Sequence, residues 1–339
     1  MSSTPTSGNG SEPATPGPWR RRRKGGRRSG RGEQTVVPRA EFTSYYGKPV
    51  LNIPAWKPAN IAGYFFLGGL AGAGSVLATG AHLTGSPVTA RALKVSSTVA
   101  IAGSAAALIH DLGRPSRFAN MLRVVKPTSP MSMGSWLLAA YGPAAGAAAV
   151  SDLTGLLPRT GTAATVGAGL LGPAVATYTA VLAADTAVPA WHEGYRELPF
   201  VFAGSATAAA AGMALLTGPT GEARAARGAA LFGAALESGA TRAMEGRLGM
   251  IAETYRTGTA GRFSRAAKGL TAAGALCATA ATRSRTAAVL SGGALLAASA
   301  CTRLAVFHAG RASAEDPKYT VVPQRERLDR RRAGAAPAR

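Results

Sequence analysis

Eight mainly apolar stretches, each of roughly 20 residues, most constrain what this chain can fold into, because an α-helix of that length crosses the hydrocarbon core of a bilayer. They cover about residues 60–82, 90–112, 134–152, 162–186, 198–217, 225–242, 266–282 and 285–308. Inside a membrane, a helix satisfies all its backbone hydrogen bonds within one segment. The sequence therefore predicts an all-α, polytopic membrane protein with about eight transmembrane helices.

The chain is strongly basic, with 38 Lys and Arg residues against 16 Asp and Glu residues, although 47% of its residues are hydrophobic. Such basicity is typical of proteins that meet nucleic acid or an anionic membrane surface. Much of the charge lies in two segments outside the apolar stretches, residues 20–31 and 325–332. We therefore predict no nucleic-acid partner, a disordered basic tail at 1–55, a transmembrane domain at 56–310 and a polar basic tail at 311–339.

The distribution of positive charge also predicts an orientation, since Lys and Arg in short loops favour the cytoplasmic side. Taken together, both tails and the loops after the second, fourth and sixth stretches carry more of this charge than the remaining loops do together. We therefore expect both termini in the cytoplasm. We expect the membrane to be a bacterial cell membrane, because the Arg-, Ala- and Gly-rich composition is typical of GC-rich coding DNA. The aromatic fraction is only 6%, which favours close Ala and Gly packing between helices, for example at Gly68 and Gly72.

A polar turn joins the second and third stretches, where Asp111 must meet water or a polar cavity. Its sequence is His110-Asp111-Leu112-Gly113-Arg114-Pro115, and Pro115 is expected to end the helix near Gly113. The run Ser129-Pro130-Met131-Ser132-Met133-Gly134-Ser135-Trp136 follows it. A second block covers residues 178–191 and 198–202.

These blocks, with Arg117-Phe118 and Asn120-Met121-Leu122, resemble the NrfD/PsrC family from about residue 60 to residue 218. Its members are quinone-reactive membrane subunits of polysulfide-reductase-like and formate-dehydrogenase-like complexes. The resemblance implies two four-helix bundles that divide near residues 190–198. It also implies bound menaquinone or ubiquinone, a ferredoxin-like iron–sulfur subunit and a molybdopterin oxidoreductase subunit acting on formate, polysulfide or a related small substrate.

Polar residues within the apolar stretches gather toward one membrane face. Asn60 and Tyr64 lie four residues apart, and so share a helix face near the start of the first stretch. The others are His110 and Asp111 at the end of the second stretch, Tyr178 and Asp185 toward the end of the fourth, and Glu237 toward the end of the sixth. With the alternating direction of successive spans, these positions fall at the same end of the molecule.

A quinone headgroup needs donors to its two carbonyl oxygens and a route for protons, because its two-electron reduction takes up two protons. The predicted headgroup ligands are Asn60, Tyr64 and Tyr178. The predicted proton carriers are His110, Asp111, Asp185 and Glu237. The residues predicted to dock the iron–sulfur subunit, from two loops on this face, are Arg114, Arg117 and Trp191.

Each assignment has a structural alternative. Asp111 and Arg114, three residues apart, pair at a helix end in one interpretation. Asn60 caps the first helix in another. Tyr64 and Tyr178 are then ordinary interfacial aromatic residues.

The chain has too few metal ligands to complete a redox reaction alone. Its two cysteines, Cys277 and Cys301, have no CxxC spacing, and an iron–sulfur cluster or zinc site needs more ligands. His110 and His308 are a formal pair for haem, but the resemblance points to a haem-free family. We expect no metal site, no haem, and clusters and molybdopterin only in partner subunits, so that the chain is a non-autonomous subunit of a quinone-dependent oxidoreductase.

Two other functions stay open at this point. A proton-conducting or transporter-like protein would use Asp111, Asp185 and Glu237 to carry ions across the bilayer. A purely structural anchor would bind no quinone.

Overall fold

The computed structural model describes residues 50–51, 57–111 and 120–335. Within these residues the regular secondary structure is helical and no strand occurs. The tail predicted to be disordered at 1–55 lies almost wholly outside the described residues. The prediction of an all-α chain is confirmed.

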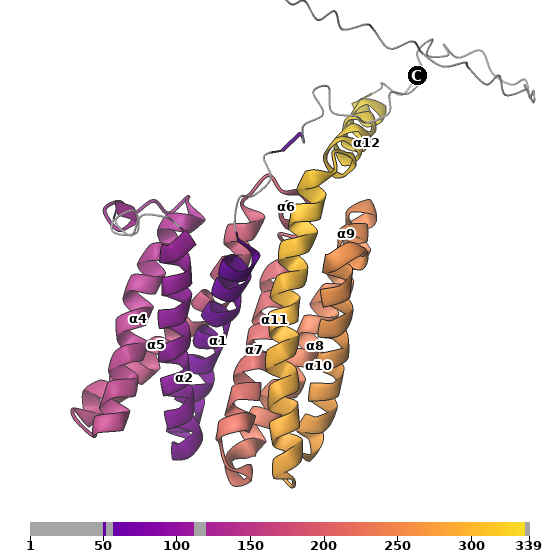
Figure 1. Cartoon of the computed structure of the whole chain (residues 1–339). Helices are drawn as coiled ribbons and strands as arrows, with labels where there is room; N and C mark the ends of the chain where they lie inside the picture. The colour runs from indigo at the N-terminus through magenta and orange to yellow at the C-terminus, as the bar shows by residue number, and fades with distance from the viewer. Residues whose placement is uncertain (1–49, 52–56, 112–119, 336–339) are drawn as a thin grey trace, which may run out of the picture. The chain divides into compact units, whose positions relative to one another are not determined.

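Four long antiparallel helices form the first bundle (Figure 1). They are α1 (Pro58–Leu83), α2 (Pro87–Asp111), α4 (Pro130–Thr154) and α5 (Pro158–Ala184). Each begins at a proline, whose fixed φ suits the first helical turn, where a backbone N–H would lack an intrahelical partner. Helix α1 packs against both α2 and α5, and α4 packs against α5 and α2.

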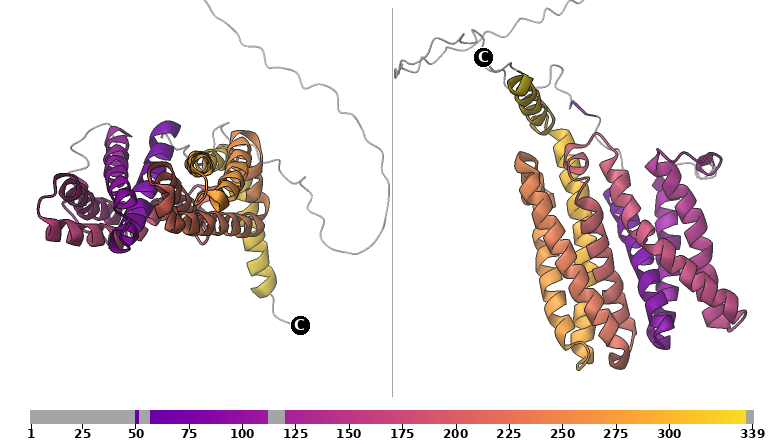
Figure 2. Two further views of the ribbon diagram at one scale, coloured as in Figure 1. Left: turned by 90° about the horizontal axis from the view of Figure 1, so that it is seen from below. Right: turned by 180° about the vertical axis from the view of Figure 1, so that it is seen from behind.

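Four further long helices form the second bundle. They are α7 (Leu198–Thr217), α8 (Ala223–Arg247), α10 (Gly258–Ala280) and α11 (Arg285–Glu315). The bundles meet where α1 and α5 contact α7 and where α1 contacts α11. Figure 2 shows the two groups of helices from below (left) and from behind (right). The prediction of eight long helices in two four-helix bundles is confirmed.

Shorter elements connect the long helices. Helix α6 (Pro189–His192) lies between the bundles, and η1 (Thr220–Glu222) joins α7 to α8. The 3₁₀ turn η2 (Gly249–Ala252) and α9 (Glu253–Arg256) join α8 to α10, and α12 (Lys318–Ala335) follows α11. The segment 311–339, predicted to be a polar tail, thus contains the end of α11 and all of α12.

Five of the described helices are long and apolar enough to cross a membrane. These are α1, α2, α5, α7 and α11. The more polar α8 and α10 and the Ala/Gly-rich α4 lie beside them within the bundles (Figure 1). The side of the membrane on which the termini lie stays a prediction.

Glycines let the long helices approach closely. A Cβ added to Gly72 of α1 would collide with the carbonyl oxygen of Gly172 of α5, and a Cβ added to Gly172 would collide with that of Gly72. In the second bundle, a Cβ on Gly204 of α7 would collide with the backbone nitrogen of Glu237 of α8. Small residues at helix crossings supply the van der Waals contact that holds membrane helices together.

Trp191 of α6 fixes the connection between the bundles in the core. The residue is fully buried, and its Nε1 donates a 2.7 Å hydrogen bond to the carbonyl oxygen of Val306. Gly310, one turn further along α11, lies directly against the indole ring. The missing side chain of Gly310 therefore makes the space that the ring occupies.

We predict that Gly310→Ala destabilises the chain although alanine favours helices, because the new methyl group overlaps the buried indole. The expected cost is about 1–3 kcal/mol, seen as a lower unfolding temperature of the purified protein in detergent. The matched control is Gly293→Ala in the same helix, where a Cβ meets no atom within 4 Å. Equal unfolding temperatures for the two variants would contradict the assigned role of Gly310.

An ion pair ties the start of α7 to the end of α8. Arg247 contacts Glu197 at 2.6 Å through Nε and 2.5 Å through Nη2, which is the bidentate geometry of a strong pair. The hydrogen bonds from Arg247 hold the pKa of Glu197 below its ordinary value of 4.5. A carboxyl group with a lowered pKa stabilises the folded state above its unfolded pKa, and this contribution disappears as the pH falls through the folded pKa.

We predict that Glu197→Gln lowers the unfolding temperature at pH 7, where wild-type Glu197 is charged and paired. The difference between the two proteins should shrink as the pH falls below about 4.5 and the wild-type carboxyl group takes up a proton. Thermal unfolding of both proteins from pH 7 to pH 3 measures this. A difference that does not change with pH would show that the charge of Glu197 contributes nothing.

Candidate functional site

Three predicted site residues meet where α1 begins and α2 ends. Asn60 Nδ2 lies 3.1 Å from His110 Nδ1 and 3.4 Å from Asp111 Oδ1. Both N–H groups of the amide are donors, so a neutral His110 accepts at Nδ1 and carries its proton on Nε2. Asn60 thus holds an imidazole and a carboxylate together at one end of the first bundle.

The contacts of Asn60 decide one of the alternatives raised by the sequence. The N-cap residue of α1 is Lys57, and Asn60 is inside the helix with its side chain directed at α2. Asn60 therefore does not cap α1. The alternative pairing of Asp111 with Arg114 involves a residue outside the described part of the chain.

Tyr64 and Tyr178 lie next to each other one turn deeper in the bundle. Their ring centroids are 6.3 Å apart in an edge-to-face arrangement. The Tyr178 hydroxyl is buried and has no hydrogen-bond partner among the described residues. A buried donor without a partner is uncommon, because it costs the full desolvation of the group. This hydroxyl is therefore available to a bound molecule.

The motif from Ser129 to Trp136 contributes space for Tyr178. A Cβ on Gly134 of α4 would lie 2.6 Å from Tyr178 Cε2, so only glycine lets the ring occupy its position. Ser129, at the start of the same motif, is the N-cap residue of α4, and its side chain accepts a hydrogen bond from the backbone N–H of Ser132. The motif thus sets where α4 begins and how the tyrosine lies.

Two predicted proton carriers lie apart from this group. Asp185 follows the last residue of α5 at the same end of the bundle and is exposed. Glu237 belongs to α8 in the second bundle and is 5% exposed. The structure thus brings Asn60 together with His110 and Asp111 and, one turn deeper, Tyr64 together with Tyr178. It leaves Asp185 and Glu237 outside these contacts.

The residues predicted to dock a partner have different positions. Trp191 is fully buried and packs in the second bundle, so it presents no surface in this structure. Arg114 and Arg117 lie outside the described residues. At the same end, Tyr195 is 50% exposed, with the guanidinium groups of Arg196 and Arg247 5.4 and 5.8 Å from its ring centroid.

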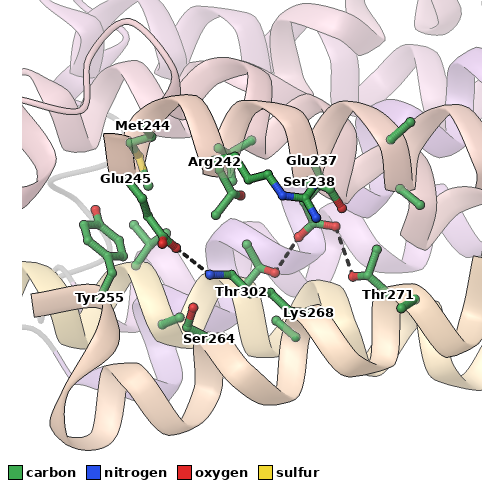
Figure 3. A pocket seen from close by; sticks show the side chains of 18 of the residues that line it. Glu237, Ser238, Arg242, Met244, Glu245, Tyr255, Ser264, Lys268, Thr271 and Thr302 are labelled. Atoms are coloured by element: carbon green, nitrogen blue, oxygen red, sulfur yellow. Dashed lines mark hydrogen bonds and ion pairs between the residues drawn. The ribbon is translucent and has the colours of Figure 1, made fainter. Parts of the chain in front are cut away.

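Glu237 lines a pocket of about 450 Å³ between α8, α10 and α11 (Figure 3). Its Oε1 lies 2.6 Å from Thr302 Oγ1, and its Oε2 accepts a 3.4 Å hydrogen bond from Thr271 Oγ1. Toward the end of the pocket, Glu245 forms ion pairs with Lys268 and Arg256, with N–O distances of 2.6 Å and 3.3 Å. The pocket therefore combines a buried carboxyl group with a charged rim.

Sequence reasoning missed two buried cations. Arg303 of α11 is fully buried, and its guanidinium group lies 3.6 Å from the ring centroid of Phe202 and donates a 3.0 Å bond to that residue's carbonyl oxygen. Lys94 of α2 is 5% exposed and contacts Asp152 at 2.9 Å and His82 at 3.3 Å. A charged residue inside an apolar stretch was the available signal for both.

The described residues contain no group of three His, Cys, Asp or Glu side chains that could hold a metal ion. Cys277 and Cys301 are unpaired thiols on α10 and α11. The first-bundle site consists of Asn60, Tyr64, His110, Asp111 and Tyr178. It offers an amide donor, an imidazole, a carboxylate and the phenol of Tyr178, whose hydroxyl has no partner among the described residues.

The first-bundle site falls within a region shared with a known family. A family model described as polysulphide reductase, NrfD, matches residues 54–228, which extend from the segment before α1 to the first turns of α8. The search of curated proteins found no match to this chain. The matched residues are more than half of the 339 in the chain. Members of this family are polytopic membrane subunits of molybdoenzyme complexes. The chain therefore belongs to the polysulphide reductase NrfD family, as the motif around Asp111 and Gly134 predicted.

Proposed function

We propose that this chain is the membrane anchor of a respiratory oxidoreductase and binds quinone or quinol at the Asn60 end of its first bundle. The observation that carries the proposal is the unpartnered Tyr178 hydroxyl, buried close to Tyr64 in the bundle whose end holds Asn60, His110 and Asp111. A quinone carbonyl oxygen accepts the hydrogen bond that this hydroxyl does not make inside the protein.

Two residues at that end of the first bundle, His110 and Asp111, supply the protons that the reaction needs. Reduction of a quinone to a quinol consumes two electrons and two protons, and oxidation of a quinol releases them. His110 takes up a proton to become the imidazolium and releases it to return to the neutral imidazole. The Asn60 amide faces Nδ1 with its nitrogen when His110 is neutral and with its oxygen when His110 is charged. Asp111 exchanges a proton between its carboxyl and carboxylate forms. Asn60 orients both groups, and Tyr64 packs against the Tyr178 ring.

The electrons come from or go to partner subunits. The described residues hold no cluster of metal ligands, and the whole chain has only two cysteines. We propose an iron–sulfur subunit docked on the face where α1 begins and α2 ends, serving a molybdopterin subunit that acts on formate, polysulfide or a related small substrate. Arg114 and Arg117 follow the end of α2 in the sequence, and the exposed Tyr195 precedes the start of α7.

The first test is the quinone content of the purified complex together with its quinone-dependent turnover. Tyr178→Phe removes the free hydroxyl and should weaken quinone binding about tenfold without lowering stability, because that hydroxyl makes no bond in the protein. Asn60→Leu should lose quinone-dependent turnover, because it releases His110 and Asp111.

The matched control is Tyr141→Phe in the same bundle. The Tyr141 hydroxyl lies 2.6 Å from both Ser75 Oγ and the Ala71 carbonyl oxygen, so its loss should lower the unfolding temperature and leave quinone binding unchanged. A wild-type complex that contains no quinone and shows no quinone-dependent turnover would refute the proposal.

A further inference from the structure

The pocket that contains Glu237 follows from how the second bundle packs. Helices α7 and α8 approach closely at Gly204 and Gly233, where an added Cβ would meet the backbone of the opposite helix. Helices α10 and α11 approach closely at Gly274, where an added Cβ would lie 2.7 Å from Leu295 Cγ. Helices α8 and α10 are in contact over a much shorter stretch. Two tight pairs therefore leave a gap between α8 and α10.

The gap has a polar strip along an otherwise apolar wall. On α8, Glu237, Thr241 and Glu245 follow one another at four-residue spacing and so share a helix face. On α10, the lining residues Lys268 and Thr271 are three apart and face them (Figure 3). The rest of the wall is mainly small and aliphatic, including Ala234, Ala235, Ala267, Ala272, Ala275 and Val306. A polar head and an apolar body both find matching surfaces here.

The hydrogen bonds of Glu237 leave it able to bind a further group. Thr302 Oγ1 lies 2.6 Å from Glu237 Oε1 and 3.1 Å from the carbonyl oxygen of Ala298, but a hydroxyl has one proton to donate. Thr302 therefore donates to only one of these two acceptors at a time. The nearby buried guanidinium group of Arg303 offsets the negative charge of the Glu237 carboxylate, both of whose oxygens accept hydrogen bonds. Glu237 Oε2 accepts a long 3.4 Å hydrogen bond from Thr271, and a carboxylate oxygen can accept more than one bond, so Glu237 has acceptor capacity toward the pocket.

The mouth of the pocket decides which molecules reach it. Ala235 and Ala272 line the pocket and are exposed, so the opening lies on the outer surface of the bundle between α8 and α10. That surface runs beside α7 and α11, which are long and apolar enough to cross the membrane. Molecules dissolved in the bilayer therefore reach the pocket from the side.

We propose that this pocket is a second binding site of the chain, for a lipid-soluble hydroquinone whose ring hydroxyl donates to Glu237 and whose tail leaves between α8 and α10. The choice of a hydroquinone rests on the proposed function, since a chain that exchanges electrons with quinone has quinol in its membrane. A volume of about 450 Å³ falls within the range of small-molecule sites, roughly 300–1,000 Å³. A phospholipid is the competing occupant, since Arg242 and Lys268 at the rim suit a phosphate, but a phosphate gains nothing from the buried Glu237.

The site differs from that of the first bundle in composition and in position. Apart from Val201, its lining residues lie beyond residue 228, where the match to the family ends, and its polar groups are carboxyl, hydroxyl and cationic groups rather than an amide and an imidazole. The two sites are in different bundles, so each can be disabled separately.

The test counts decylubiquinol molecules bound at saturation by the purified full-length chain in nanodiscs of phosphatidylcholine. The wild type should bind two per chain. Ala275→Phe, which fills the pocket, and Asn60→Leu, which disables the first-bundle site, should each bind one. The matched control is Leu276→Phe, which adds the same ring at a position that is 73% exposed and does not line the pocket, and which should bind two.

A second variant tests the same site if Ala275→Phe does not fold. Glu237→Gln is nearly isosteric but removes the negative charge that strengthens a hydrogen bond from the ring hydroxyl, so its second-site affinity should fall about tenfold while the first site is unchanged. If the wild type binds one molecule, and this binding is lost in Asn60→Leu but kept in Ala275→Phe, this inference is overturned and the proposed function stands. If the wild type binds one molecule, and this binding is lost only in Ala275→Phe, this inference is supported and the first-bundle site is refuted.

Two further outcomes would also overturn the inference. A wild-type chain that binds neither decylubiquinol nor menadiol refutes both sites. A phospholipid that mass spectrometry finds on the wild type and not on Ala275→Phe, and that decylubiquinol does not displace, shows that the pocket holds a structural lipid.

Discussion

Close contact between helix backbones is the constraint on which the rest of this structure depends. In a bilayer, helices gain little from burying apolar side chains against one another, because lipid is equally apolar, so van der Waals contact between small residues does more of the work. Gly72 with Gly172 and Gly204 with Glu237 set the spacing within each bundle. Where helices do not approach in this way, as between α8 and α10, a pocket forms. Packing and cavity thus have the same origin.

The sequence predicted the fold well because its signal was long and repeated. Eight apolar stretches matched eight helices, and the boundaries differed mainly where polar residues continue a helix, as in α11, which runs to Glu315 rather than ending at about 308. The grouping of Asn60 with His110 and Asp111 also followed from helix direction alone. Periodicity could not place Glu237, because it does not say which of eight helices become neighbours.

Arg303 shows what a one-dimensional pattern leaves out. Its partners, the Phe202 ring and carbonyl oxygen, lie about a hundred residues earlier in the chain, and its Nε and Nη1 have no partner among the described residues. A buried guanidinium group is tolerated only with compensation, and stacking on an aromatic ring supplies part of it. Gly69 of α1 lies directly beside the guanidinium group, so the charge is at the junction of the two bundles.

The reciprocal contact of Gly72 and Gly172 also limits how this chain can change over generations. Every amino-acid replacement of either glycine adds a Cβ, and each added Cβ collides with the backbone of the other residue, whatever that other residue is. A change at one position therefore gives no freedom to the other, and relief requires the two helices themselves to separate. The crossing is mutationally locked: descendants of this sequence can alter the helix faces around it, but they keep both glycines or rebuild the bundle.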